Sequence, residues 1–97
     1  IAASSMATEK HAIICGYGRS GQYLARFLEQ EGVSYVALDL DPERVREAAA
    51  AGDTVVYGDA ARREALVAAG LMRASVLIVS YADADSALRV LALVARS

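Results

Sequence analysis

The sequence predicts an α/β fold in which a parallel β-sheet is covered by helices on both faces. Two observations predict it. Short apolar segments with β-branched residues alternate with amphipathic segments of helical periodicity, four of each along the 97 residues. Three of the amphipathic segments end at a glycine, a residue that commonly terminates a helix. Because parallel strands are joined by right-handed crossovers, the expected strand order in the sheet is 3-2-1-4.

The predicted elements follow one another with short connections. Strands are expected at 11–15, 34–39, 53–58 and 74–80, and helices at 21–32, 42–52, 61–70 and 83–97. The second helix has Asp41 as its N-cap and Pro42 in its first turn, where the fixed φ of proline suits a helix. We expect Asp83 or Asp85 to cap the fourth helix.

A chain of this length predicts one small domain, which we place at residues 11–97. The small and polar residues 1–10 are interpreted as a linker or an expression remnant. The fourth strand contains VLIVS, which is apolar on both faces, as a central strand is. As an edge strand it would present unpaired hydrogen-bonding groups. We therefore expect a domain that is incomplete at its C-terminal end, with the sheet continued by strands absent from this chain or by a partner.

Composition and charge argue against several classes of protein. The chain is 56% hydrophobic and carries a formal net charge of −2, so we expect no nucleic-acid partner. No apolar run reaches the roughly 20 residues that cross a bilayer. The single cysteine, Cys15, forms no internal disulfide and is expected to be a packed core residue in a reducing compartment. His11 is the only histidine, and no ligand cluster accompanies it, so no metal site is expected.

A glycine-rich motif, G-x-G-x-x-G, lies between the first strand and the first helix. Gly16 allows the tight turn out of the strand, Gly18 lets the backbone approach a pyrophosphate, and Gly21 lets the helix pack closely on the strand. The N-terminus of the helix offers free N–H groups to phosphates. Arg19 can add a charge-assisted contact. Tyr17, inside the loop, either covers the phosphates or packs in the core, and the sequence does not choose between these alternatives.

An acid at the end of the second strand completes the dinucleotide-binding pattern. Asp39 lies 23 residues after Gly16, close to the expected interval of about 20 residues. Its carboxylate is expected to accept hydrogen bonds from ribose hydroxyls and to repel a 2′-phosphate, which favours NAD(H) or an adenosine nucleotide over NADP. Leu40, the next residue, is also expected to line the nucleotide. The alternative is that Asp39 only begins a turn.

The third strand ends in YGDA, at positions 57–60. Asp59 and Ala60 are expected beside the adenine end of a nucleotide, because the carboxyl ends of parallel strands meet at one edge of the sheet. Alternatively, Asp59 caps the third helix. The two interpretations are compatible.

These residues carry a resemblance to a known family. IICGYGRSGQYLARFLEQEGVSYVALDLDPERV followed by VVYGDAARREALVAAG resembles the nucleotide-binding half of the TrkA-N domain, also called RCK or KTN. The closest variety is the cytoplasmic domain of KefB/KefC-type potassium efflux antiporters, and the resemblance covers nearly all of residues 11–95. The motifs that carry it are G-x-G-R-x-G, D-x-D-P and G-D-A.

The resemblance implies a Rossmann-like regulatory domain that binds NAD(H), AMP or a related adenine nucleotide, dimerises, and biases a membrane transporter or channel. It implies a soluble domain at the cytoplasmic side of the inner membrane. The implied phosphate-binding residues are Gly16, Gly18, Arg19, Ser20 and Gly21. Asp39 is implied at the ribose, Asp59 and Ala60 at the adenine, and Ser80 near the ligand, while Asp41 is implied as the helix cap.

The chain departs from the KefC-like pattern at two places. Such domains tend to have Asp-Asp after the fourth strand and an Asn in the next helix, where this chain has Ala82-Asp83 and Ala87. Subunit or linker contacts that depend on those polar groups are therefore not implied here. Glutathione sensing, a property of the Kef branch, is not implied either, because its pocket is not expected within these residues alone.

An alternative function is the cofactor-binding half of an NAD-dependent dehydrogenase. Such an enzyme needs a general acid or base and a substrate pocket near the nicotinamide. The only histidine lies at the start of the first strand, and the only lysine, Lys10, precedes it. We therefore expect a domain that binds its ligand without turnover and is not an enzyme.

Overall fold

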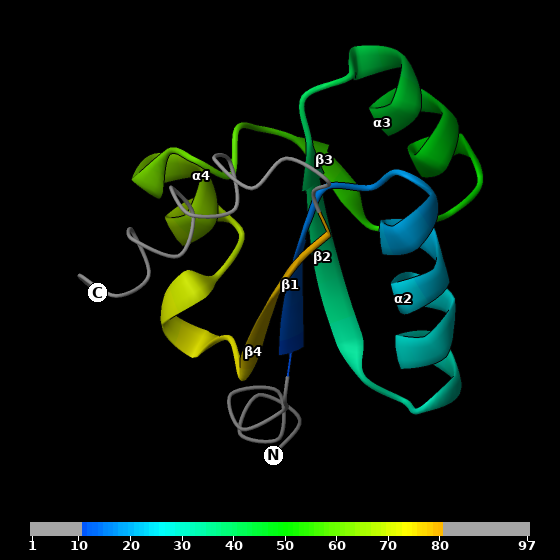
Figure 1. Ribbon diagram of the computed structural model, residues 1–97, viewed down its shortest axis with the longest axis horizontal. Coiled ribbons are helices and arrows are strands. Elements are labelled where there is room, and N and C mark those ends of the chain that lie inside the picture. The colour runs from blue at the N-terminus through cyan, green and yellow to red at the C-terminus, as the bar shows by residue number, and fades with distance from the viewer. Residues whose placement is uncertain (1–10, 81–97) are drawn as a thin grey trace.

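The computed structural model describes residues 11–80. It contains a four-stranded parallel sheet of order β3-β2-β1-β4, with helices on both faces (Figure 1). The strands are β1 (His11–Cys15), β2 (Ser34–Asp39), β3 (Val55–Tyr57) and β4 (Val76–Val79). The helices are α2 (Arg19–Gln30), α3 (Pro42–Ala50), α4 (Arg63–Ala68) and the 3₁₀ turn η1 (Leu71–Arg73). The predicted fold class and strand order are confirmed.

The alternation of side chains along β1 produces two hydrophobic clusters, one on each face of the sheet. Ala12 and Ile14 point to the face that α2 and α3 cover, and they pack in one cluster. Ile13 and Cys15 point to the opposite face, where Leu66 of α4 joins the second cluster. All four β1 residues are fully buried, as expected for a strand in the middle of a parallel sheet.

The start of α3 agrees with the prediction. The Asp41 side chain accepts from the backbone N–H groups of Glu43, at 3.0 Å, and Arg44, at 3.4 Å. Pro42 occupies the first turn. Beyond the other end of α3, Gly52 has a φ of 89°, a conformation that favours glycine. The sequence signals at both ends of this helix therefore act as predicted.

Several boundaries differ from the prediction. The three helices end two residues before the predicted glycines, at Gln30, Ala50 and Ala68, because a turn leads from each helix to its glycine. Strands β3 and β4 are shorter than the predicted ranges 53–58 and 74–80.

Two helix starts differ as well. Helix α2 begins at Arg19, so Gly21 lies inside its first turn. Helix α4 begins at Arg63 because a turn around Asp59 precedes it, in which the Asp59 carboxylate accepts from Ala61 N–H at 2.9 Å. The alternative that Asp59 caps this helix is therefore wrong: the N-cap is Arg62, which makes no side-chain capping bond.

Some expectations lie outside the described residues. They include the linker at 1–10, the helix at 83–97 with its Asp83 or Asp85 cap, and the departures at Ala82-Asp83 and Ala87. Within residues 11–80, β4 pairs with β1 alone, so continuation of the sheet by further strands stays a prediction. In the same range, no helix has both the length and the hydropathy needed to cross a membrane.

The second hydrophobic cluster supplies a test of the layered fold. Leu66 is fully buried, whereas its neighbour Val67 is 45% exposed. We expect Leu66→Ala to lower the free energy of unfolding by about 2–4 kcal/mol, because it removes buried methyl groups and leaves a cavity. Val67→Ala is the matched control and should cost less than about 1 kcal/mol. Urea unfolding measures both, and equal losses would contradict the placement of α4 on the sheet.

Candidate functional site

The candidate site is the loop that follows β1, at the carboxyl edge of the sheet. Strand β1 is flanked by β2 on one side and β4 on the other. The chain leaves β1 into α2 on one face of the sheet, and it reaches β4 through α4 on the opposite face (Figure 1). Ligands of open α/β sheets bind at this kind of switch point, outside the carboxyl ends of the strands.

The three glycines of the loop have three different environments. Gly16 has a φ of 101°, which L side chains rarely adopt, and its N–H donates to Leu38 O at 2.8 Å. A Cβ on Gly21 would overlap the carbonyl oxygen of Gly16, so only glycine lets α2 lie this close to β1. A Cβ on Gly18 would meet nothing within 4 Å. The backbone at Gly18 therefore faces open space, as the predicted phosphate contact requires.

The N-terminus of α2 begins beside that space. Gly18 is the N-cap and offers no side-chain acceptor, and the first turn contains no acidic residue. The side chains of Arg19 and Ser20 are exposed. The first N–H groups of a helix have no partner within the helix, and the helix dipole favours an anion beside them. This end of α2 is therefore suited to bind a phosphate.

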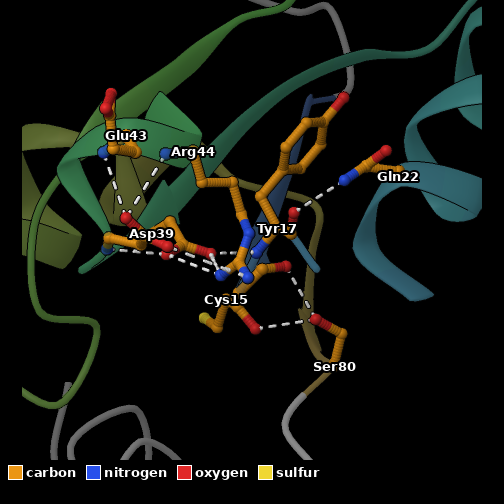
Figure 2. Close-up of polar contacts among 9 residues, drawn as sticks. Cys15, Tyr17, Gln22, Asp39, Glu43, Arg44 and Ser80 are labelled. Atoms are coloured by element: carbon orange, nitrogen blue, oxygen red, sulfur yellow. Dashed lines mark hydrogen bonds and ion pairs between the residues drawn. The ribbon is translucent and has the colours of Figure 1, made fainter. Parts of the chain in front are cut away.

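Asp39 joins the loop to the start of α3. The Asp39 side chain is 8% exposed, and Oδ2 accepts from the N–H of Tyr17 at 2.7 Å (Figure 2). Its other oxygen, Oδ1, accepts from Asp41 N–H at 2.8 Å. A buried carboxylate costs free energy unless it is hydrogen-bonded, and these two backbone donors supply that compensation. Asp39 therefore fixes the loop, and its contact with a ribose stays a prediction.

A guanidinium also covers Asp39. Arg44 Nη1 lies 3.2 Å from both carboxylate oxygens of Asp39 (Figure 2). Its Nη2 lies 3.9 Å from Asp41 Oδ2. Arg44 comes from the first turns of α3, five residues after Asp39, and its side chain is 42% exposed. The sequence interpretation did not include this residue, although the Asp-to-Arg spacing around the start of a helix would have suggested it.

The side chain of Tyr17 lies in the core and not on the loop surface. It is 1% exposed, and its ring stacks on Tyr35 with 6.5 Å between the centroids. Its hydroxyl donates to Asp53 Oδ2 at 2.8 Å and accepts from Arg26 Nη2 at 2.9 Å. Burial raises the pKa of Tyr17 well above its ordinary value, so the hydroxyl stays protonated. Of the two alternatives for this residue, the structure shows the packed one.

Arg26 and Asp53 form an ion pair beside Tyr17 that the sequence did not reveal. Arg26 Nη2 lies 2.7 Å from Asp53 Oδ1. Hydrogen bonding to Arg26 holds the pKa of Asp53 below its usual value. The two residues are 27 positions apart and belong to no motif, so only the packing of α2 against the end of α3 brings them together.

Ser80 supports the loop from the end of β4. Its Oγ lies 2.7 Å from Gly16 O and 3.0 Å from Cys15 O, and its N–H donates to Cys15 O at 3.1 Å (Figure 2). The single hydroxyl hydrogen is therefore directed at the carbonyl oxygens of Gly16 and Cys15, and the contact with Gly16 is the shorter one. Ser80 lies just beyond the end of β4 and holds the loop against the sheet, and its contact with a ligand stays a prediction.

The remaining predicted site residues lie at the ends of β2 and β3. Leu40 is 53% exposed, and Asp59 is part of the turn before α4. Ala60 is fully buried and packs in the cluster of Leu66. The structure thus brings Leu40 and Asp59 to the carboxyl edge, while the Ala60 side chain faces the core.

Cys15 has the environment of an inert core thiol. It is fully buried at the end of β1, and burial raises the pKa of its thiol to about 12. A thiol with so high a pKa is a poor nucleophile at neutral pH. Among residues 11–80, no cluster of three or more His, Cys, Asp or Glu side chains is placed to hold a metal ion.

A parallel sheet of order 3-2-1-4, a glycine turn after its first strand and an acid after its second define a Rossmann-like domain of the nucleotide-binding type. The family can be stated more closely. The TrkA-N domain family matches residues 12–97, and the chain belongs to this family.

Relatives and solved structures agree with this assignment. The chain is 42% identical over 83 residues to a protein of Alkalimonas amylolytica described as a K(+) efflux antiporter KefB, covering 86% of this chain. It is 40% identical over 86 residues to the glutathione-regulated potassium-efflux system protein KefC of Cronobacter sakazakii, covering 89% of this chain. It spans only 13% and 14% of the lengths of these two relatives.

Two solved structures share the fold. The Kef CTD of Shewanella denitrificans in AMP-bound form is 36% identical, with a TM-score of 0.77, and the match covers 90% of this chain and 52% of that one. The TrkA-N domain of the inner membrane protein ybaL from Escherichia coli is 30% identical, with a TM-score of 0.82, over 90% of this chain and 64% of that one.

The loop geometry predicts effects of different size for two glycine substitutions. We expect Gly21→Ala to lower the free energy of unfolding by about 1–3 kcal/mol, because the new methyl group collides with the backbone of Gly16. Gly18→Ala should change it by less than about 1 kcal/mol, because the site is open and its φ of −74° suits alanine. Urea unfolding of both variants measures this contrast. Equal losses would show that α2 does not lie against the loop as described.

The Arg26–Asp53 pair predicts a pH effect on stability. The pKa of Asp53 in the folded state is below its value of about 3.9 in the unfolded chain. The ionised carboxylate therefore stabilises the fold at any pH above about 3.9. This stabilisation is lost as the pH falls through the folded-state pKa. Asp53→Asn should therefore lose less stability than the wild type between about pH 5 and pH 3. Urea midpoints at the two pH values measure this.

Arg26→Gln removes the cause of the pKa shift and should flatten the same part of the pH profile. If Asp53→Asn keeps the full wild-type slope, the pair does not contribute to acid sensitivity.

Proposed function

We propose that this chain is the nucleotide-binding regulatory domain of a Kef-type potassium efflux system, and that it binds AMP, NAD(H) or another adenine nucleotide at the loop 16–21. Membership of the TrkA-N family, the names of the potassium-efflux relatives and the AMP-bound form of a structural neighbour support this proposal. The transport part is a membrane module outside these 97 residues, and the domain works at its cytoplasmic face.

The observation that carries the proposal is the open space at Gly18 in front of the uncapped N-terminus of α2. A phosphate placed there accepts hydrogen bonds from the backbone N–H groups of Arg19, Ser20 and Gly21. The exposed guanidinium of Arg19 adds a charged donor. Gly16 contributes the turn that aims these groups.

The rest of the nucleotide extends along the carboxyl edge of the sheet. The ribose hydroxyls donate to the Asp39 carboxylate, which the backbone already holds in place. The adenine lies between the ends of β2 and β3, near the exposed Leu40 and the turn at Asp59, and Ala60 closes the core beneath it. Ser80 and Tyr17 act by fixing the loop, the first from β4 and the second from the core.

The site supports binding without chemistry. The only histidine, His11, lies at the opposite end of β1 from the loop and donates to Ala69 O at 3.0 Å. Cys15 is buried with a raised thiol pKa. Neither is placed to act as an acid, base or nucleophile at the loop, which favours a regulatory domain over half of a dehydrogenase. Regulation then follows from a ligand that prefers one conformation of a homodimer coupled to the membrane module.

Ligand-induced thermal stabilisation tests the proposal. We expect AMP or NAD(H) at 100 times its dissociation constant to add about 2.7 kcal/mol to the stability of the chain, which raises Tm by more than about 10 °C. Gly18→Ala should melt near the wild-type temperature without ligand and lose most of this shift, because its methyl group occupies the phosphate space.

Gly32→Ala is the matched control. Gly32 lies just past the other end of α2 with a φ of 72°, so alanine there lowers Tm through strain but should leave the ligand-induced shift intact. Absence of a shift with every adenine nucleotide would contradict the proposal. Steady oxidation of NADH by the chain with small carbonyl compounds would favour the dehydrogenase alternative.

A further inference from the structure

In this structure, donor groups of the protein already surround the Asp39 carboxylate at the position proposed for the ribose. A carboxylate has about four acceptor positions. Two of those on Asp39 are taken by the backbone N–H groups of Tyr17 and Asp41. The guanidinium of Arg44 lies across the rest of the carboxylate, with the single nitrogen Nη1 3.2 Å from both oxygens.

The backbone donors and Arg44 differ in whether they can leave. The N–H groups of Tyr17 and Asp41 are fixed by the loop and by the turn into α3. Arg44 is held only by its side chain, which is 42% exposed and has many rotamers. A ribose that donates its 2′ and 3′ hydroxyls to Asp39 therefore has to take the positions that Arg44 occupies.

The Arg44 guanidinium has acidic neighbours other than Asp39. Arg44 lines a cavity of about 170 Å³ whose wall also contains the acidic residues Glu47 and Asp53. Asp41, whose carboxylate is 3.9 Å from Arg44 Nη2, is a third acidic neighbour. Asp53 already pairs with Arg26, so Glu47 and Asp41 are the carboxylates that the guanidinium can approach when it leaves Asp39. Its displacement therefore does not leave it without an acidic neighbour.

We propose that Arg44 is an internal competitor for the ribose-binding carboxylate, and thus a residue that sets the affinity and the ribose selectivity of the site. This inference rests on the proposed nucleotide-binding function. In the free domain Arg44 pairs with Asp39, and in the bound domain the ribose diol replaces it. Removing the competitor makes the ribose hydroxyls contribute more to binding.

The test compares two ligands on three proteins. The ligands are AMP and 2′,3′-dideoxy-AMP, which carry the same phosphate and base and differ in the two hydroxyls. The proteins are wild type, Arg44→Met and the control Arg46→Met. Arg46 is on the same helix, is 69% exposed and pairs with Glu43, so its replacement removes the same charge without touching Asp39. Isothermal titration calorimetry on the 97-residue chain gives the dissociation constants.

The measured quantity is the ratio of the dissociation constant for 2′,3′-dideoxy-AMP to that for AMP. Loss of a positive charge weakens the binding of both anionic ligands by the same factor, so this effect of charge cancels in the ratio. We expect Arg44→Met to raise the ratio about fivefold over wild type. A half-exposed ion pair contributes about 1 kcal/mol, which corresponds to this factor, and AMP no longer has to break such a pair in the variant. Arg46→Met should leave the ratio at the wild-type value.

The other outcomes are distinct. A ratio that is unchanged or lower in Arg44→Met, with AMP bound by the wild type, overturns the competition and leaves the proposed function standing. A rise of equal size in Arg46→Met also overturns it, because the effect would then come from charge and not from the contact with Asp39. If neither the wild type nor Arg44→Met binds AMP, NAD⁺ or NADH, the proposed function fails and the inference fails with it.

Discussion

The hydrogen bond from the Tyr17 backbone N–H to the buried Asp39 carboxylate is the interaction on which the rest of the site depends. It joins the turn after β1 to the end of β2, and the same carboxylate receives the N–H of Asp41 where α3 is about to begin. A carboxylate that is 8% exposed is tolerated only with such partners, so loop, strand end and helix start have to form together. Asp39 therefore has a structural role on which its proposed role as a ribose acceptor depends.

Tyr17 extends this connection to the other end of α3. Its backbone bonds Asp39, before the helix, while its hydroxyl bonds Asp53, after the helix. Arg26 on α2 holds the same hydroxyl and the same carboxylate. One residue of the phosphate loop thus contacts both flanks of α3 and, through Arg26, the middle of α2. A ligand that moves the loop would therefore also move α2 and α3 relative to the sheet. In the proposed function, this is how binding at the loop changes the surface of the domain.

The features that could be predicted from the sequence are those encoded by short-range patterns. Strand order followed from alternating segments and crossover handedness, the α3 start from Asp41-Pro42, and the glycine loop from its spacing. The starts of α2 and α4 were placed two residues from their observed positions, because local hydrogen bonds such as that of Asp59 decide them. The burial of Tyr17 and its contact with Asp53 could not be predicted, since they depend on how distant segments pack. The contact of Arg44 with Asp39 was open to prediction from spacing alone, but a helix residue with that charge has many exposed alternatives.

The pair of Asp39 with Arg44 also limits how strongly the ribose by itself can regulate. A ligand shifts a conformational equilibrium only by the difference between its interactions with the two states. Displacement of a half-exposed ion pair costs about 1 kcal/mol, or about fivefold in affinity, and this cost reduces what the ribose hydroxyls contribute. Moving a two-state domain from one extreme population to the other needs about 5.5 kcal/mol. In the proposed function, most of the bias therefore has to come from a phosphate bound at the N-terminus of α2, where the free domain has open space at Gly18 and no competing side-chain cap. In the proposed mechanism, Asp39 and Arg44 set the selectivity for the ribose. The phosphate bound at the loop 16–21 supplies most of the free energy that shifts the conformation of the domain.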